Sequence, residues 1–161
     1  MANIFLKFTP DVEGESKDNE NTGWIEIESF SYGISNPSYA QSGSGASGGQ
    51  ATFADLSLAK RVDKATAALL LKAASGQHFD KAELVLYKAG GEGRVKYLEI
   101  TLEKVYITSY NLGGSDGSGV PMESISCSYS QIRQKYTLQD DQGGTGASTE
   151  FGWNVATNEA V

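Results

Sequence analysis

Alternation of apolar and polar side chains is the dominant pattern along this chain. In residues 24–34, for example, Ile25 and Ile27 alternate with two glutamates. Period-two alternation bounded by glycine-rich turns is typical of antiparallel strands. The strand-like stretches are residues 4–8, 24–34, 83–88, 94–111 and 123–139. The pattern therefore predicts a mainly β protein.

The two longest of these stretches each contain a one-residue break in the alternation. Leu98 and Leu102 hold even positions, whereas Val105 and Ile107 hold odd ones, and the last stretch makes the reverse change after Tyr129. A one-residue slip in a period-two pattern indicates a β-bulge, which bends the strand and increases its twist. Two adjacent strands that bend at the same level predict a small closed β-barrel of two curved antiparallel sheets.

One segment, from about residue 64 to 74, has a helical pattern. Asp63 is a candidate N-cap, and Gly76 stands where a C′ glycine is expected. Three successive leucines and five alanines leave only a narrow polar stripe. The leucines are Leu69, Leu70 and Leu71. A helix that is apolar nearly all round is buried on more than one side, so we expect a second surface to cover this flanking helix.

Residues 35–50 are polar, small and rich in glycine, and they predict a long projecting loop. Loops longer than about 12–15 residues without their own secondary structure are usually functional or mobile. The glycines near its end are Gly43, Gly45, Gly48 and Gly49.

Four serines alternate with apolar residues in the last long stretch. They are Ser124, Ser126, Ser128 and Ser130. Small hydroxyls on alternate positions form a flat, wettable and weakly charged face. Two interpretations remain open: an ordinary solvent-facing sheet surface, or a wall that lines an aqueous space.

Length and charge limit the classes of function. At 161 residues with 39% hydrophobic residues, the chain is expected to form one domain over residues 1–161. The formal net charge of −7 disfavours nucleic acid as a partner. We find neither an apolar run long enough to span a bilayer nor the apolar core of a signal peptide near Met1. We therefore expect no membrane insertion, and a cytoplasmic location before any export.

The residues that carry catalytic or metal chemistry are few. His78 is the only imidazole and Cys127 the only thiol, so no Cys/His zinc set is possible, and we expect no cofactor and no metal. Gly43, Gly45 and Gly48 match a Gly-x-Gly-x-x-Gly spacing, but the strand-like residues 51–58 follow them instead of a phosphate-binding helix. We predict that His78 and Cys127 are structural and that the protein is not an enzyme.

Several blocks of residues, in order along nearly the whole chain, resemble one known family. They are Ile4-Phe-Leu-Lys7, residues 12–18, residues 25–35, residues 55–60, residues 62–66, Ser75-Gly-Gln-His78, Ala82-Glu-Leu84, Lys88-Ala-Gly-Gly91 and Phe151-Gly-Trp-Asn154. The family is that of the haemolysin-coregulated proteins (Hcp), the tube proteins of bacterial type VI secretion systems.

The resemblance implies a β-barrel with a helix at its flank, six copies of which close into a homohexameric ring. It implies that rings stack into a tube, which is exported without a cleavable signal peptide together with small effector proteins that the ring carries and protects. The implied partners are further copies of the chain, sheath and tip proteins of the secretion machine, and the effectors.

The resemblance also suggests roles for the features described above. The leucines of the helix and the glycines of the 35–50 loop become candidates for contacts between subunits. The serines at 124–130 become candidates for the lumen wall. Ser115, in the turn Gly113-Gly-Ser-Asp-Gly117, matches a position at which cargo contact is expected.

Two alternatives share the predicted fold. A phage-type tail tube subunit would assemble in the same way in another biological context. A free-standing β-barrel module would instead bind a ligand with its turns at residues 90–93 and 113–119.

Overall fold

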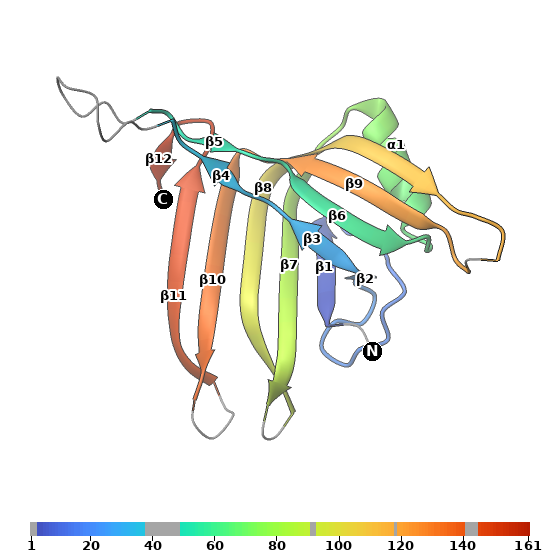
Figure 1. The fold of residues 1–161 in the computed structure, drawn as a ribbon, viewed down its shortest axis with the longest axis horizontal. Coiled ribbons are helices and arrows are strands. Elements are labelled where there is room, and N and C mark those ends of the chain that lie inside the picture. Colours follow the sequence, from blue (N-terminus) through green and yellow to red (C-terminus); the bar gives the residue numbers. More distant parts are fainter. Residues whose placement is uncertain (1–2, 38–48, 91–92, 118, 141–144) are drawn as a thin grey trace.

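In the residues that the structure describes, the protein has two layers of antiparallel sheet, a separate two-stranded ladder and one helix (Figure 1). The computed structural model describes residues 3–37, 49–90, 93–117, 119–140 and 145–161. We call the two layers sheet A and sheet B, and the long strand β8 belongs to both. No helix within the described residues has the length and apolar character needed to cross a membrane.

Sheet A is the larger layer. Its strands follow the order β12-β11-β10-β8-β7-β1-β2. Their bounds are β1 Ile4–Thr9, β2 Ile25–Glu26, β7 Phe79–Gly90, β8 Gly93–Gly113, β10 Gln131–Gln139, β11 Thr145–Asn154 and β12 Glu159–Ala160. Every neighbouring pair is antiparallel.

Sheet B packs in front of the upper part of sheet A (Figure 1). It contains β3 (Ser29–Ser31), β6 (Leu56–Arg61), β9 (Met122–Ser128) and the second half of β8, in the order β3-β6-β9-β8. A separate two-stranded ladder joins β4 (Ile34–Ser35) to β5 (Thr52–Phe53), at the base of the predicted 35–50 loop. We call this ladder the arm.

The predicted slip in alternation near Glu103 and Lys104 is confirmed, and β8 changes sheets there, but the predicted β-bulge is not at this point: the register of β8 with β9 shifts between Ile107 and Ser109. Leu102 and Val105 are both buried, so the alternation slips by one residue between them. Lys104 has a positive φ of 52°. Up to Glu103 β8 pairs with β10, up to Val105 it pairs with β7, and from Tyr106 it pairs with β9. Because of this bend, the single strand β8 pairs with strands of both sheets.

The second predicted break has a different origin. The prediction of one strand over residues 123–139 is wrong, because the structure has two strands, β9 and β10, in different sheets. Between them, the Ser130 amide donates to the Glu103 carbonyl at 2.9 Å, and the Val155 amide donates to the Ser130 carbonyl at 2.8 Å. These hydrogen bonds hold a corner at which the chain passes from sheet B to sheet A.

The expected closed barrel is also wrong, since the sheets in the described residues do not close. Ladder pairing ends at β2 in sheet A and at β3 in sheet B. Between these two short strands, the Ile27 amide donates to Ile4 of sheet A and the Glu28 amide donates to Ala59 of sheet B. Successive residues thus bond to different layers, and the layers meet at a corner of the chain rather than through a ladder.

The helix α1, Thr66–Ser75, confirms the predicted segment but begins slightly later. The prediction of Asp63 as the N-cap is wrong, because Ala65 holds that position and makes no side-chain cap hydrogen bond. Asp63 contacts the residues at the start of the helix instead: its Oδ1 accepts from the Ala65 amide at 3.0 Å, and its amide donates to Thr66 Oγ1 at 3.1 Å. Gly76 ends the helix in the left-handed conformation, as predicted, with φ 71°.

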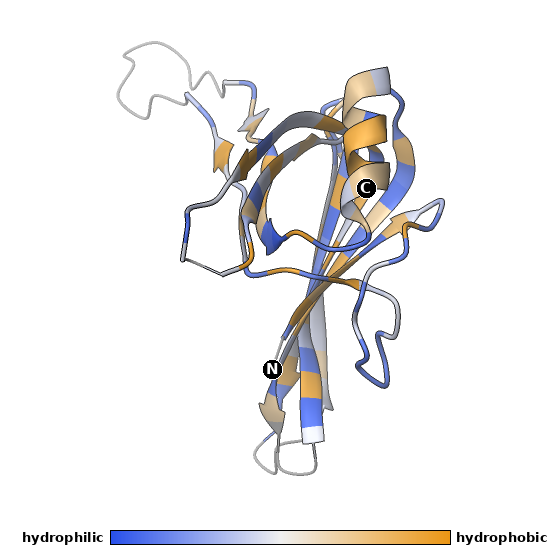
Figure 2. Cartoon of the chain, turned by 90° about the vertical axis from the view of Figure 1, so that its right-hand side faces the viewer, coloured by the Kyte–Doolittle hydropathy of each residue, from blue (hydrophilic) through white to orange (hydrophobic). Residues whose placement is uncertain are grey.

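The hydrophobic core lies between the two sheets and under α1. Buried side chains of β1, β6, β7, β8, β9 and β10 meet there with Leu69 of the helix. Phe8 and Phe79 stack with ring centroids 4.2 Å apart. Hydrophobic and hydrophilic residues alternate along the strands (Figure 2), as one covered and one uncovered sheet face require.

Candidate functional site

The alternating serines that the sequence predicts belong in part to a wider surface of hydroxyl groups on sheet B. The strand register places Ser31, Ser57, Ser126 and Ser109 opposite one another in one row across β3, β6, β9 and β8. A second row contains Ser29, Ala59, Ser124 and Asn111. We call these eight residues the serine face. All of them are at least partly exposed, on the side of sheet B that points away from the core.

This surface forms a shallow hollow with a volume of about 350 Å³. None of the residues that line the hollow is charged. Charged side chains appear only beyond its two ends. At one end Arg61 pairs with Glu28 at 3.1 Å, and at the other Asp55 accepts a hydrogen bond from Thr108 at 2.6 Å. The hollow therefore offers many small donors and acceptors without a net electrostatic field of its own.

The structure separates the five predicted lumen residues. Ser124 and Ser126 lie on the serine face, and Ser128 follows them on β9, opposite Tyr106. Ser130 lies at the corner after β9, where its hydroxyl donates to the Glu103 carbonyl at 3.1 Å. Ser115 lies in the exposed turn that joins β8 to β9. The serines of the other three strands were missed, because only the register brings them beside β9.

A buried ion network lies behind the serine face. The ammonium of Lys60 forms an ion pair with Glu123, and neither side chain is exposed. Lys60 Nζ also donates to Asp63 Oδ1 and to the Arg61 carbonyl, each at 2.9 Å. All three ammonium hydrogens therefore have acceptors, as burial of a charge demands.

The same network joins α1 to three strands of sheet B. Glu123 accepts hydrogen bonds from Thr66 Oγ1 at 3.0 Å and from the Tyr110 hydroxyl. Burial, together with the neighbouring Glu123 carboxylate, raises the pKa of Tyr110 to about 12, so its hydroxyl stays a donor at neutral pH. Because these residues come from β6, β8, β9 and the start of α1, the network fixes how the helix sits on the sheet.

The helix buries only one of its three leucines in the single chain. Leu69 lies in the core, whereas Leu70 is 41% exposed and Leu71 is 67% exposed. The second covering surface that the sequence predicts is therefore not supplied by the residues that the structure describes. Contact of this outer leucine face with another subunit stays a prediction.

The arm is attached to the body by a small aromatic cluster. Phe53 of β5 stacks on Trp153 with centroids 6.5 Å apart and meets the edge of Tyr129 at 6.4 Å. The Tyr129 hydroxyl donates to the Ala54 carbonyl at 2.9 Å. Of the predicted interface glycines, Gly43, Gly45 and Gly48 lie outside the described residues. Gly49 lies so close to Pro37 that a Cβ would be 2.7 Å from its Cγ.

His78 and Cys127 lie in ordinary structural surroundings. The His78 ring is 5.3 Å from the ring of Tyr106, and its Nε2 is 3.8 Å from Asp80 Oδ1. Burial, with a smaller contribution from Asp55, raises the pKa of the Cys127 thiol to about 12, so the thiol is protonated and unreactive at neutral pH. In the part of the chain that the structure describes, no group of His, Cys, Asp and Glu is arranged to bind a metal.

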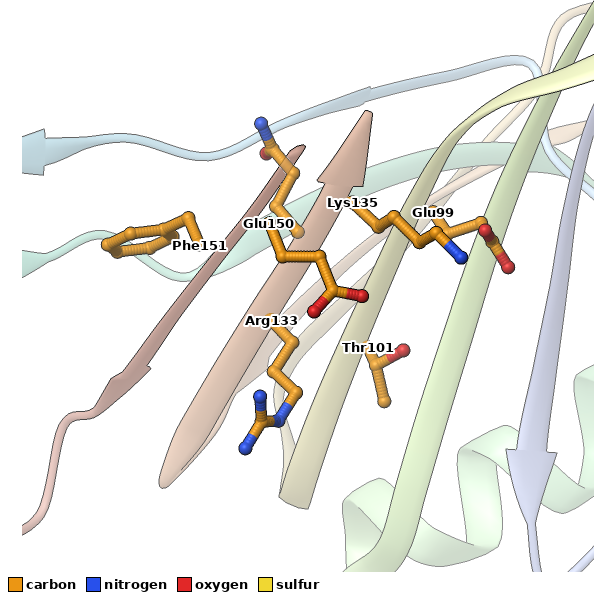
Figure 3. A pocket seen from close by; sticks show the side chains of 7 residues that line it. Glu99, Thr101, Arg133, Lys135, Glu150 and Phe151 are labelled. Atoms are coloured by element: carbon orange, nitrogen blue, oxygen red, sulfur yellow. The ribbon is translucent and has the colours of Figure 1, made fainter. Parts of the chain in front are cut away.

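A second hollow, of about 150 Å³, lies on sheet A (Figure 3). Glu99 of β8, Lys135 of β10 and Glu150 of β11 form one cross-strand row beside it. Arg133 lies on the same strand as Lys135 (Figure 3). Opposite charges on neighbouring strands stabilise a sheet surface. This alternation contrasts with the uncharged serine face.

Comparisons with known proteins agree with this architecture. The family model described as "Type VI secretion system effector, Hcp" matches residues 5–136. The chain is 36% identical over 158 residues to Protein hcp1 of Pseudomonas aeruginosa, covering 98% of this chain and 97% of that one.

Solved structures show the same likeness over whole chains. A structure of a type six secretion system protein matches with a TM-score of 0.92 and 29% identity, and both chains are covered completely. Hcp1 from Salmonella typhimurium matches with a TM-score of 0.81 and 28% identity, again over both complete chains. The chain therefore belongs to the Hcp family of secreted type VI secretion tube proteins, which is a structural family rather than an enzyme family.

Proposed function

We propose that six copies of this chain close into a ring, that rings stack into the secretion tube, and that the serine face lines its lumen. The observation that carries the proposal is the uncharged hollow of about 350 Å³ across four strands of sheet B. The exposed leucines of α1 support assembly, because a single chain leaves them in contact with water.

The chemistry of the serine face suits a wall that holds protein cargo weakly. Serine hydroxyls and an asparagine amide both donate and accept hydrogen bonds, so they can contact varied polar surfaces. A wall without charge neither repels nor traps a charged effector. Small effector proteins are therefore the cargo that we propose for the lumen, and sheath and tip proteins are the partners outside the tube.

A charge placed in the middle of the serine face tests this assignment. Ser126→Arg introduces a long cation at the centre of the hollow, and Ser148→Arg places the same residue on the exposed surface of β11. We expect both variants to form rings with an open centre in electron micrographs. Only Ser126→Arg should lose the effectors that copurify with the wild type, because only its arginine would enter the lumen.

Two results would contradict the proposal. Equal retention of effectors by both variants would place the serine face outside the lumen. A wild-type protein that stays monomeric at every concentration would exclude the ring, and saturable binding of a small molecule by that monomer would favour the ligand-binding module instead.

A further inference from the structure

The two sheets of the protein overlap only in part, because they are shifted sideways relative to each other. On one side the hairpin of β8 and β9 extends past sheet A, and on the other side the lower parts of β10 and β11 have no strand of sheet B in front of them (Figure 1). Each sheet therefore has a part whose inner face is not covered by the other sheet. We call these two parts the B overhang and the A overhang. On the hairpin of β8 and β9, α1 covers the inner face as far as Glu123, which is fully buried.

The A overhang exposes apolar side chains near the end of β10. Ile132 is buried in the core, and Tyr136, four residues later and on the same face, is 38% exposed. Leu138, near the end of the strand, is 47% exposed. Gln134 lies between these two residues and the core, and it accepts a hydrogen bond from Tyr32. This contact marks the end of the part of β10 that other segments of the chain cover. The apolar pattern of β10 thus continues beyond the part that the chain itself buries.

The B overhang also has an exposed apolar side chain, on the inner face of β8. Tyr110 pairs with Ile125 on the inner face, and both pack in or against the core. Leu112 is the next inner-face residue, opposite Glu123, and it is 58% exposed. The sheet therefore continues past the edge of the core with an apolar residue on the face that would normally meet sheet A.

We infer that Leu112 of one copy packs against Tyr136 and Leu138 of the next copy, so that the sandwich continues from subunit to subunit. Each overhang presents the kind of surface that the opposite sheet covers elsewhere in the same chain. The two overhangs are different surfaces at opposite sides of the molecule, and a head-to-tail ring needs such a pair. This inference rests on the proposed ring and specifies which faces form its contacts.

Cysteine pairs test the contact directly. We expect L112C/Y136C or L112C/L138C, oxidised without reductant, to form covalent multimers up to the hexamer on a denaturing gel. L112C, Y136C and L138C alone should stay monomeric, because a head-to-tail contact never brings identical positions together. An equimolar mixture of L112C with the matching single variant should stop at covalent dimers, because each chain can then form only one bond. Buried Cys127 is present in every variant and in the wild-type control.

The possible outcomes distinguish a failure of this contact from a failure of the proposed ring. If the double variants form rings by mass measurement but neither crosslinks, other faces meet and the inference is wrong. If a single variant forms covalent dimers, a face meets its own copy and the inference is equally wrong. If the wild type never assembles, the proposed ring fails and the contact fails with it.

Discussion

Lys60 and Glu123 form a buried ion pair behind the serine face, and this pair helps to fix how α1 sits on sheet B. Their charges are fully buried, and the removal of two ions from water has a high free-energy cost. Further hydrogen bonds offset that cost: Lys60 donates to Asp63, and Glu123 accepts from Thr66 and Tyr110. Two apolar side chains at these positions could be buried equally well, but they would fix the position of α1 less precisely. We interpret the network as a device for specificity.

Removal of the lysine charge alone should destabilise the fold strongly. Lys60→Met leaves Glu123 buried without a cation, which we expect to lower the free energy of unfolding by about 3–5 kcal/mol. Urea denaturation measures the change. Arg61→Ala is the matched control on the same strand, because the Arg61–Glu28 pair is largely exposed and such pairs contribute about 0–1 kcal/mol.

The double variant Lys60→Met/Glu123→Met completes the cycle. It removes both charges, so it should be more stable than Lys60→Met. Equal stability of the single and double variants would show that the unpaired carboxylate carries no penalty, contrary to the role that we assign to the pair.

At the scale of elements, β8 organises the molecule because it carries both sheets. Its first half pairs with β7 and β10, and its second half with β9. The bend near Lys104 could be predicted, because a slip in alternation is a local signal, whereas the change of sheet at that point depends on which strands pair there. The strand β11 was not predicted, because apolar side chains appear only near its end, at Phe151 and Trp153. Its place depends on pairing with β10 instead of on its own pattern.

The two faces of α1 should respond differently to the same substitution. Leu69→Asp places a charge in the core, so we expect the protein to unfold or to lose much of its stability. Leu70→Asp changes a side chain that the single chain leaves exposed, so the fold should persist while ring formation is lost. Circular dichroism reports the fold and native mass spectrometry reports the ring. An unchanged hexamer in Leu70→Asp would show that this face of the helix has no subunit contact.

At the scale of the whole molecule, charge opposes the assembly that the apolar surfaces favour. Each chain carries a formal charge of −7, so a ring of six carries −42. Repulsion between such rings is screened by salt, with a Debye length of about 8 Å at 0.15 M. Contacts within a ring rely more on apolar burial, which salt does not weaken.

Stacking of rings should therefore depend on salt more than ring formation does. We expect separate rings at low ionic strength and longer stacks as salt is added. Light scattering across a salt series measures the stacks, and native mass at each step measures the ring. Scattering that stays flat while the ring persists would show that charge repulsion does not limit stacking.

The sequence by itself determined the features that depend on near neighbours. These include the strands, which show a period of two, the helix with its terminal glycine, the slip in alternation near Lys104 and the serines of β9. It also determined the family, because the matching blocks follow one another along the chain. Local sterics and side-chain alternation are encoded residue by residue, so they can be read without the fold.

Only the tertiary structure decided how distant segments meet. It separated β9 from β10 at Ser130, left the two sheets open instead of closing a barrel, and staggered them so that Leu112 and Tyr136 are exposed. It also placed serines of four strands in shared rows and enclosed Lys60 with Glu123. Register and packing between remote residues set these features, and the local pattern of any one strand fits several registers equally well.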